Sequence, residues 1–509
     1  MAYEDSLSEL EARRAKVKEM GSPKRLAERR AAGILNARER VDAFVDAGTF
    51  TEVGLHAHSD NPLHKHKSPA DGVITGFGDV DGRPVGIVAH DFTTLGASTA
   101  TVYSRKTSYV HRVAREKGIP FVHFGEAGGA RLPDSLDAGG FGAMALGGKG
   151  SLGRDRTTPW ATAILGQAFG GPTWDAVRSD YVVMRRGATM GVSSQQVTSV
   201  AVSEADTEEE YCGWRMHTRD TGMADLAVNS DLDALAALRA FLSYVPSHNL
   251  ELPPSAPVPS GSDDGAAQLL DIVPDNRRKT YDMHHVIEAI FDRESFLALK
   301  GRHARAVITG LARLGGEVVG VIASNPRIKG GAMDGEACDK ATSFVVFCDS
   351  FNIPMVMLAD TPGFLVGLEG ERRKLAGKVT NFLDALATTT VPLLTLVLRK
   401  AYGLSYLNFG GGLADALGIW SIGEASLMDP EVAVNVIHGV RASDPGFSER
   451  VAEMKQDTSA YALASTFAAH EVLDPRESRS FLLRMLDLHR RRLRDGIGEH
   501  LMRNWPTTI

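Results

Sequence analysis

Two short segments of this chain place glycine where a strand is expected to turn into a helix, which frees backbone N–H groups to bind an anion. Residues 167–171 read QAFGG and follow the apolar run TPWATAILG. Residues 401–405 read AYGLS and follow TTVPLLTLVLRK. The first N–H groups of a helix lack intrahelical acceptors, and the helix dipole favours negative charge there. Each segment therefore predicts an oxyanion hole, although glycine serves a purely structural tight turn equally well.

An internal repeat relates the two halves of the chain. The block DGVITGFGDVDGRPVGIVAHD at 71–91 matches RAVITGLARLGGEVVGVIASN at 305–325. The block GIPFVHFGEAGGA at 118–130 matches NIPMVMLADTPGF at 352–364. Both pairs are offset by 234 residues. Two independent blocks with one offset indicate a shared module, so we expect two similar domains.

The elements that position these turns alternate between strands and helices. Short apolar runs such as VGIVAHDF and PMVMLAD are bounded by glycine, proline and aspartate and are separated by helical segments. This alternation predicts an α/β fold with largely parallel sheets, which bind ligands at the carboxyl ends of their strands. The 234-residue offset pairs Gly170 with Leu404 and Gly171 with Ser405.

A linker-like segment divides the chain almost in half. Residues 252–265 read LPPSAPVPSGSDDG and offer little apolar surface to bury. We therefore expect an N-terminal domain at 1–251 and a C-terminal domain at 266–509.

The composition excludes several classes of protein. The chain has 509 residues, of which 43% are hydrophobic and 23% charged, with a net charge of −7. This is ordinary globular composition without the diffuse positive charge of nucleic-acid-binding proteins. Three cysteines are too few for a disulfide framework and suit the reducing cytoplasm. No apolar run approaches the about 20 residues that span a bilayer, and we predict no metal site.

Taken together, these segments resemble the carboxyltransferase (β) subunits of biotin-dependent acyl-CoA carboxylases, the propionyl-CoA/acetyl-CoA carboxylase group. The resemblance extends from residue 36 to the C-terminus. Its landmarks include the GGAR of 128–131, IVPDNRRKTYDMHHVI at 272–287, CDSFNIPMVMLADTPGF at 348–364 and RKAYGLSY at 399–406. It implies two tandem crotonase-type spiral α/β domains, in agreement with the repeat.

The resemblance also implies a mechanism that uses two backbone oxyanion holes and no side-chain base. Gly170 and Gly171 would hold the thioester oxygen of an acyl-CoA as an enolate, and Leu404 and Ser405 would hold the ureido oxygen of carboxybiotin. Carboxybiotin would release CO2, the biotin anion would take the α-proton, and the enolate would attack CO2. Further substrate-binding residues would be Gly128, Gly129, Ala130, Arg131, Lys149 and Leu407. For Lys149 and Arg131 the alternatives are a contact with a CoA phosphate and an ordinary structural or solvated role.

The second turn departs from the family pattern. The family usually has Tyr-Gly-Gly-Ala-Tyr where this chain has YGLSY at 402–406. A leucine at positive φ would be strained. Leu404 and Leu407 would either line the acyl pocket or point into the core. An acyl-CoA decarboxylase of the same fold and a non-catalytic scaffold are therefore the alternative functions.

The chain has neither a biotin-accepting Met-Lys-Met motif nor an apparent ATP-binding glycine-rich loop. The resemblance therefore implies a partner, the biotin carboxylase/biotin carrier (α) subunit. It also implies ring-like hexamers with active sites shared between chains.

Overall fold

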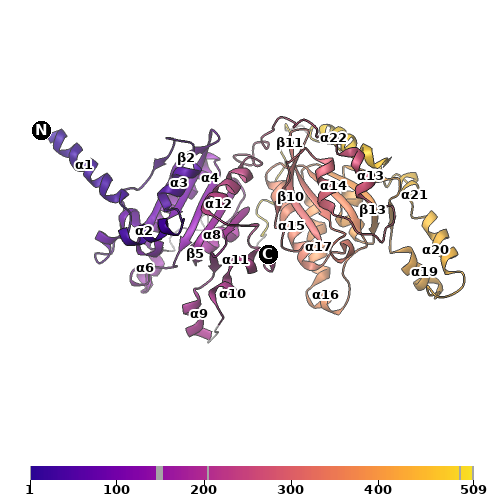
Figure 1. The fold of residues 1–509 in the computed structure, drawn as a ribbon, viewed down its shortest axis with the longest axis horizontal. Coiled ribbons are helices and arrows are strands. Elements are labelled where there is room, and N and C mark those ends of the chain that lie inside the picture. The colour runs from indigo at the N-terminus through magenta and orange to yellow at the C-terminus, as the bar shows by residue number, and fades with distance from the viewer. Residues whose placement is uncertain (1, 145–152, 203–205, 492–494, 507–509) are drawn as a thin grey trace. The chain divides into compact units, whose positions relative to one another are not determined.

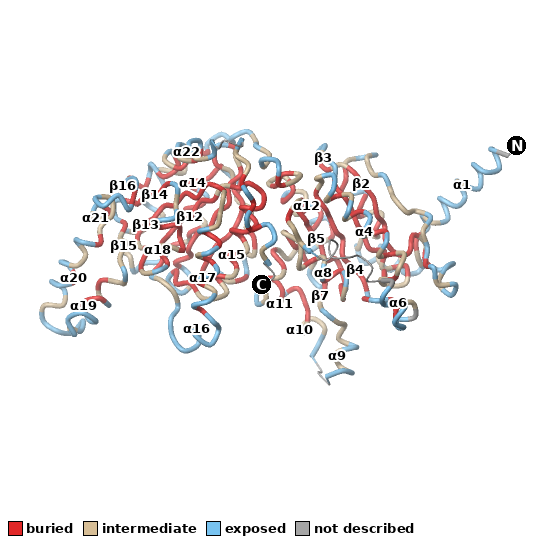
Figure 2. Tube along the Cα trace, turned by 180° about the vertical axis from the view of Figure 1, so that it is seen from behind, coloured by how far each residue is buried: buried red, intermediate tan, exposed pale blue. Residues whose placement is uncertain are grey.

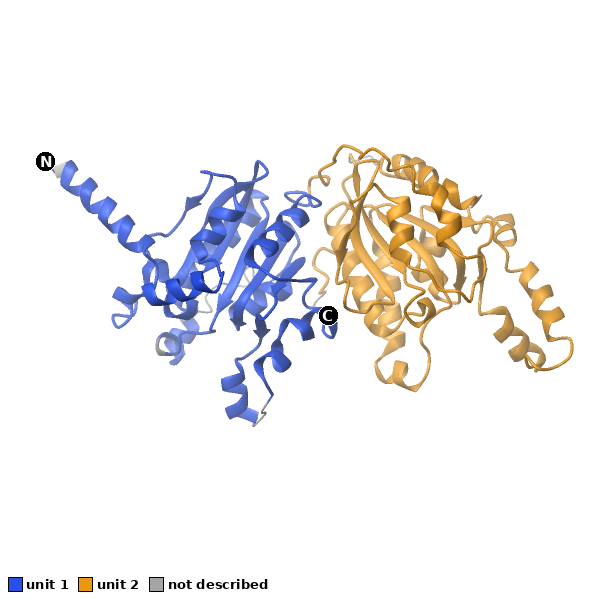
Figure 3. Cartoon of the chain, viewed as in Figure 1, with its two compact units in different colours: residues 1–249, 508 blue, residues 250–507, 509 orange. Residues whose placement is uncertain are grey.

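The computed structural model describes residues 2–144, 153–202, 206–491 and 495–506, and the chain forms two compact units. Unit 1 comprises Met1–Asn249 and unit 2 comprises Leu250–Thr507 (Figure 3). Each unit contains a mixed sheet with helices packed against it (Figure 1). In the described part of the chain, no helix is both long and apolar enough to cross a membrane.

Unit 1 is built on a sheet with the strand order β1-β2-β3-β4-β5-β6-β8, and β7 pairs with β5. The β2–β3 pair is antiparallel, whereas the pairs from β3 to β8 are parallel. The strands are β1 (Thr51–Glu52), β2 (Val73–Val80), β3 (Arg83–His90), β4 (Phe121–Ala127), β5 (Trp160–Phe169), β6 (Tyr181–Arg185), β7 (Thr189–Gly191) and β8 (Leu226–Val228).

Unit 2 repeats this topology in the order β16-β14-β13-β12-β11-β10-β9, with β15 paired to β13. Its β10–β11 hairpin is again antiparallel, and the pairs from β11 to β16 are parallel. The strands are β9 (Leu297–Leu299), β10 (Val307–Leu314), β11 (Glu317–Ser324), β12 (Met355–Thr361), β13 (Leu393–Tyr402), β14 (Ala416–Trp420), β15 (Glu424–Ser426) and β16 (Glu471–Leu473). The prediction of two repeated, largely parallel α/β domains is confirmed.

Some helices begin or end at residues that cap them. Asn36 and Glu39 form a capping box at the start of α3, and Gly118 ends α4 in the left-handed conformation. The helices of unit 1 are α1 (Ala2–Lys18), α2 (Pro23–Ala31), α3 (Ala37–Phe44), α4 (Thr101–Lys117), α5 (Leu132–Ser135), α6 (Ala138–Met144), α8 (Gly171–Arg178), α9 (Gln195–Val202), α10 (Glu208–Cys212), α11 (Trp214–Arg219) and α12 (Asp231–Leu242). Those of unit 2 are α13 (Leu269–Ile272), α14 (Met283–Ile290), α15 (Gly335–Ser350), α16 (Leu368–Arg372), α17 (Leu375–Thr388), α18 (Ser405–Asn408), α19 (Pro430–His438), α20 (Phe447–Gln456), α21 (Ala460–Ser465) and α22 (Ser478–His489).

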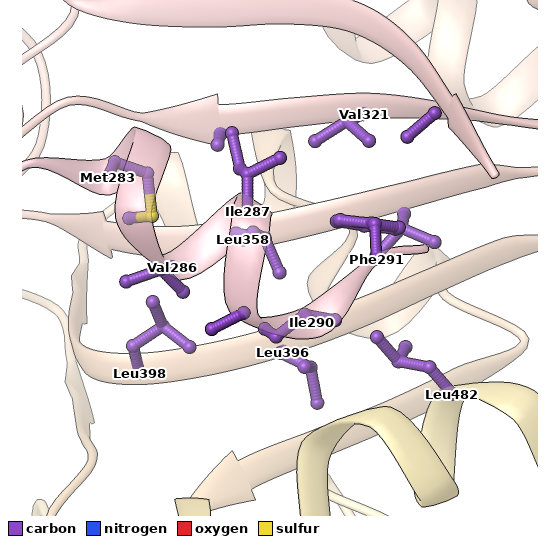
Figure 4. Packing of buried hydrophobic residues seen from close by; sticks show 14 of the residues in the cluster. Met283, Val286, Ile287, Ile290, Phe291, Val321, Leu358, Leu396, Leu398 and Leu482 are labelled. Atoms are coloured by element: carbon purple, nitrogen blue, oxygen red, sulfur yellow. The ribbon is translucent and has the colours of Figure 1, made fainter. Parts of the chain in front are cut away.

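The buried residues of each unit concentrate in its sheet (Figure 2). In unit 2, helix α14 packs against the central strands (Figure 4). Its buried residues belong to one cluster with leucines of the strands and of α22; the helix residues are Met283, Val286, Ile287 and Ile290, and the leucines include Leu358, Leu396, Leu398 and Leu482. The strands there are apolar on both faces because helices cover both sides of a parallel sheet. This packing fixes the carboxyl ends of β12 and β13, where the second predicted turn lies.

A pair of buried lysines shows that the repeat extends to atomic detail. Lys106 Nζ donates to the carbonyl of Val73 at 2.5 Å, and Lys340 Nζ donates to the carbonyl of Val307 at 2.8 Å. Both pairs are related by the 234-residue offset. Each ammonium is buried among backbone carbonyls and fixes the loop before the first long strand of its unit.

The proline-rich segment 252–265 is part of unit 2 and is hydrogen-bonded to the β10–β11 hairpin. Arg313 donates to the carbonyl of Pro254 at 2.7 Å, and the N–H of Ala256 donates to the carbonyl of Gly316 at 2.9 Å. The boundary between the two units lies just before this segment, between Asn249 and Leu250.

Candidate active site

The first predicted turn lies at the carboxyl end of β5 in unit 1. Gly170 has φ of +69°, a conformation that an L side chain rarely adopts, and its N–H donates to the carbonyl of Gly191 at 3.3 Å. Gly171 begins α8, and in the described part of the chain its N–H has no acceptor. The next residue is Pro172, which has no N–H. Of the two predicted donors, only the N–H of Gly171 is therefore free to bind an anion.

The glycine loop after β4 lies against this turn. A Cβ placed on Gly170 would lie 4.0 Å from the Cα of Gly129, and one on Gly129 would lie 3.8 Å from the carbonyl oxygen of Phe169. Gly129 has φ of +99° and is buried, whereas Gly128 and Ala130 on either side are exposed. The structure thus brings together two predicted site residues, Gly129 and Gly170, that are 41 positions apart in sequence.

Thr99 fixes this glycine loop through backbone hydrogen bonds. Its N–H donates to the carbonyl of Gly129, and its carbonyl accepts from the N–H of Arg131, both at 2.8 Å. These bonds form a parallel bridge between Thr99 and Ala130. The N–H of Ala130 has no acceptor within the described residues, so it is a second free donor in the loop beside Gly171.

Arg131 is committed to contacts inside unit 1. Its guanidinium is buried, forms an ion pair with Asp71 at 2.7 Å and donates to the carbonyl of Ser98 at 2.9 Å. The side chain therefore fixes the loop between β4 and α5 and is not directed at a ligand phosphate. Lys149 lies within residues 145–152, outside the described residues.

The second predicted turn, in unit 2, has the same backbone shape with its register shifted by one residue. Gly403 has φ of +63° and donates its N–H to the carbonyl of Ser426 at 2.8 Å, as Gly170 does to Gly191. The structural equivalents are therefore Gly170 with Gly403 and Gly171 with Leu404. The sequence offset of 234 residues is wrong at this point because the segment between β12 and β13 is one residue shorter than its counterpart in unit 1.

This register removes the strain expected at Leu404. Its φ and ψ are −62° and −20°, ordinary helical values, because Gly403 takes the left-handed position. The N–H groups of Leu404 and Ser405 have no acceptors among the residues described. The Leu404 side chain is 46% exposed, so it does not belong to the core, while Leu407 is partly buried. Ser405 is buried, and its hydroxyl donates to the carbonyl of Tyr402 at 2.6 Å.

A buried carboxylate lies at equivalent positions near the end of β4 and of β12. Glu126 accepts from Arg29 at 2.7 Å and from Arg40 at 2.6 Å. Burial by itself raises the pKa of the Glu126 carboxyl, but Arg40 and Arg29 reverse this effect and hold the pKa below its ordinary value.

Asp360, 234 positions later, accepts from Arg399 at 2.9 Å and from the hydroxyl of Tyr281 at 2.8 Å. Sequence analysis missed these paired supports of the two turns because the arginines come from distant parts of the chain.

A charged cavity of about 250 Å³ lies near the carboxyl end of β13. Its charged lining residues are the cations Arg277, Arg278, Lys279, Arg399 and Lys400 and the carboxylates Asp429 and Glu431. Arg277 donates to the hydroxyl of Tyr402 at 2.7 Å, and Tyr402 ends β13 directly before the turn. The segment 272–287, which carries part of the family resemblance, therefore supplies three of the cations that line this cavity.

The comparisons with known proteins agree with this architecture. Over 514 aligned positions, the chain is 34% identical to the propionyl-CoA carboxylase carboxyltransferase subunit of Haloferax mediterranei, covering 96% of this chain and 98% of that protein. It is 31% identical to the methylmalonyl-CoA decarboxylase subunit alpha of Veillonella parvula, covering 93% of each chain. A crystal structure of the transcarboxylase 12S hexamer with methylmalonyl-coenzyme A bound matches with a TM-score of 0.88 and 32% identity over 95% of this chain and 94% of that one. This match confirms the expected tandem crotonase-type fold. The family model for the carboxyl transferase domain matches residues 28–500, and the chain belongs to this family.

Proposed function

We propose that this chain is the carboxyltransferase subunit of a biotin-dependent acyl-CoA carboxylase, which moves a carboxyl group from carboxybiotin to the α-carbon of an acyl-CoA. The observation that carries the proposal is the pair of matching turns, one in each unit. Each joins a positive-φ glycine to backbone N–H groups that have no acceptor in the described structure. Family membership supplies the reaction class, and the two turns supply one anion site for each of the two reactants.

In unit 1, the N–H groups of Gly171 and Ala130 would hold the thioester oxygen of the acyl-CoA. Loss of the α-proton places negative charge on this oxygen, and preorganised N–H donors stabilise that charge more strongly than water does. The eight-residue helix α8 adds its dipole at the same point. The absence of side chains at Gly129 and Gly170 leaves room for the thioester to approach the backbone.

In unit 2, the N–H groups of Leu404 and Ser405 would hold the ureido oxygen of carboxybiotin. Carboxybiotin supplies the carboxyl group and then a base for the α-proton. Helix α18 has only four residues, so its dipole adds little and the two N–H groups supply the stabilisation directly. In the cavity near this turn the five cations outnumber the two carboxylates, Asp429 and Glu431, and this excess of positive charge suits a negatively charged carboxyl group.

The second candidate is an acyl-CoA decarboxylase, favoured by the similarity to the Veillonella decarboxylase subunit. Decarboxylation is the reverse of the carboxyl transfer described above, so the same two oxyanion holes would serve it. We further propose that the chain forms a hexamer, as in the 12S structure. Its partner would be a separate biotin carboxylase/biotin carrier subunit. A cytoplasmic location would suit the free cysteines Cys212, Cys338 and Cys348.

The two candidates are separated by a biotin-dependence assay with a panel of acyl-CoAs and of their carboxylated forms. The purified chain is combined with the biotin carboxylase and carrier proteins of the same cell. A carboxyltransferase incorporates labelled bicarbonate into an acyl-CoA in the presence of ATP. A decarboxylase releases CO2 from the carboxylated acyl-CoA and fixes no bicarbonate, and a scaffold does neither.

A further inference from the structure

The hydroxyl of Thr99 lies close to Gly171, the residue whose N–H is free at the start of α8. A Cβ placed on Gly171 would lie 3.6 Å from Thr99 Oγ1, and no other heavy atom outside its chain neighbours would come within 4 Å. Oγ1 is buried, and it has no hydrogen-bond partner in the described structure. The buried, unpartnered hydroxyl is therefore next to the first residue of α8.

The backbone of Thr99 holds this hydroxyl in a fixed place. The two 2.8 Å hydrogen bonds to Gly129 and Arg131 fix the residue between the glycine loop and α4. Arg131 is itself held by its ion pair with Asp71. A hydroxyl positioned in this way is preorganised, which is the property that makes a donor effective towards charge developing in a transition state.

A buried hydroxyl without a partner costs folding free energy, because it has lost its hydrogen bonds to water. Valine has the same shape and avoids this cost. The presence of threonine is therefore explained if the hydroxyl gains a partner when a ligand is bound. The free N–H of the neighbouring Gly171 is a donor, so a ligand atom that serves both groups must be an acceptor.

The repeat shows that the backbone bridge itself does not need a hydroxyl. In unit 2 the equivalent residue is Met333, whose N–H donates to Gly363 at 3.1 Å and whose carbonyl accepts from Leu365 at 2.8 Å. Met333 is fully buried and apolar. The same scaffold thus carries a hydroxyl beside the turn of unit 1 and a thioether at the equivalent place in unit 2.

We propose that Thr99 is a catalytic residue of the acyl-CoA site, whose hydroxyl donates a hydrogen bond to the thioester oxygen alongside the N–H of Gly171. This inference rests on the function proposed above. It adds a side-chain donor to a hole otherwise made of backbone, and it makes the two holes chemically different. The site in unit 1 is then the stronger oxyanion hole, matched to the enolate.

The kinetic test compares Thr99→Val, Thr99→Ser and the wild type in the reconstituted carboxylase. We expect Thr99→Val to lower kcat by about 10- to 100-fold with a smaller change in KM. Thr99→Ser keeps the hydroxyl and should retain activity within a few-fold. Thr107→Val on α4, whose hydroxyl donates only to helix carbonyls, is the matched control and should leave kcat unchanged. Equal losses in the Val and Ser variants, or none in either, would overturn the inference.

A binding measurement tests the same contact without turnover, so that a failure of the proposed function and a failure of this inference remain distinguishable. Isothermal titration compares propionyl-CoA with S-propyl-CoA, a thioether that lacks the carbonyl oxygen. Thr99→Val should weaken propionyl-CoA binding by about 3- to 10-fold and leave S-propyl-CoA binding unchanged. If both ligands weaken equally, or if neither does, Thr99 does not contact the thioester oxygen and the inference falls.

Discussion

In the anion-binding turn of unit 2, Gly403 and Leu404 each meet one of the two structural requirements. Gly403 takes the positive φ of +63°, and Leu404 keeps helical angles and presents its N–H without an acceptor in the described structure. A leucine is therefore compatible with an intact hole at this position. The departure from the family pattern changes what surrounds the hole and leaves its donors in place.

Substitution of Gly171 by valine should disable the acyl-CoA hole. The new side chain would grow towards Thr99 Oγ1, which lies only 3.6 Å from the position of its Cβ. We expect kcat to fall by about 100-fold or more while assembly is retained. Gly377→Val is a suitable control because Gly377 is exposed on α17 and has no neighbour within 4 Å of its Cβ position. Turnover within a few-fold of wild type in an assembled Gly171→Val protein would place the hole elsewhere.

Substitution of Gly403 by alanine should damage the second turn, and substitution of Leu404 by glycine should not. A Cβ on Gly403 would be strained at positive φ and would lie 3.1 Å from the carbonyl oxygen of Leu427. We expect Gly403→Ala to lower the free energy of unfolding by about 1–2 kcal/mol and to reduce turnover. Leu404→Gly relieves no strain, so it should give no gain in stability. A stabilised Leu404→Gly protein in chemical denaturation would contradict the assigned register.

Acyl-CoA preference should depend on the leucines of the second turn. Leu404 is 46% exposed, which excludes a core role and leaves its side chain able to contact a ligand. We expect the combined variant Leu404→Gly, Ser405→Ala and Leu407→Asp to reorder kcat/KM among acetyl-, propionyl- and larger acyl-CoAs by at least about 10-fold, since each buried apolar contact is worth about 1–3 kcal/mol. A uniform loss with every substrate would show damage to the biotin site or to packing, and a role in specificity would be rejected.

The buried ion pairs of Glu126 should make stability depend on pH. The pKa of this carboxyl in the folded protein is below its ordinary value of 4.5, so its contribution is complete above that pH and is lost as the pH falls through the folded pKa. Glu126→Gln removes the carboxylate that pairs with Arg29 and one of the two that pair with Arg40, which also contacts Asp231 at 2.9 Å, and it should destabilise unit 1 by about 3 kcal/mol at pH 7. Denaturant unfolding at several pH values should also show a weaker acid dependence in this variant.

Glu116→Gln is the control, because the exposed pair of Glu116 with Arg112 should contribute less than about 1 kcal/mol. Equal effects of the two substitutions would show that Glu126 is not the buried support described above.

Much of the fold was predictable from the sequence because the repeat is marked by apolar strand blocks that keep a constant spacing. The first turn was also predictable, since consecutive glycines after a strand indicate both positive φ and close approach. The register of the second turn was not, because the shortened segment between β12 and β13 carries no motif that marks the missing residue. Thr99 and the buried role of Arg131 were missed because both depend on contacts between distant parts of the chain. Arg131 pairs with Asp71, sixty residues away.

The purified chain alone should fix no bicarbonate in the presence of ATP, whatever acyl-CoA is supplied. It has no biotin-accepting motif and no apparent ATP-binding loop. Addition of the biotin carboxylase and carrier proteins should restore fixation. Incorporation of label by the isolated chain would rule out a carboxyltransferase that depends on a partner.

Transfer from a pre-carboxylated carrier tests the central claim most directly. The carrier protein is loaded with labelled carboxybiotin, freed of ATP and bicarbonate, and mixed with this chain and an acyl-CoA from the panel. The account predicts that label moves to the α-carbon of the acyl-CoA in the wild type and that Gly171→Val lowers this transfer by about 100-fold. Label that stays on the carrier, or leaves as CO2 while every acyl-CoA of the panel remains unlabelled, would contradict it.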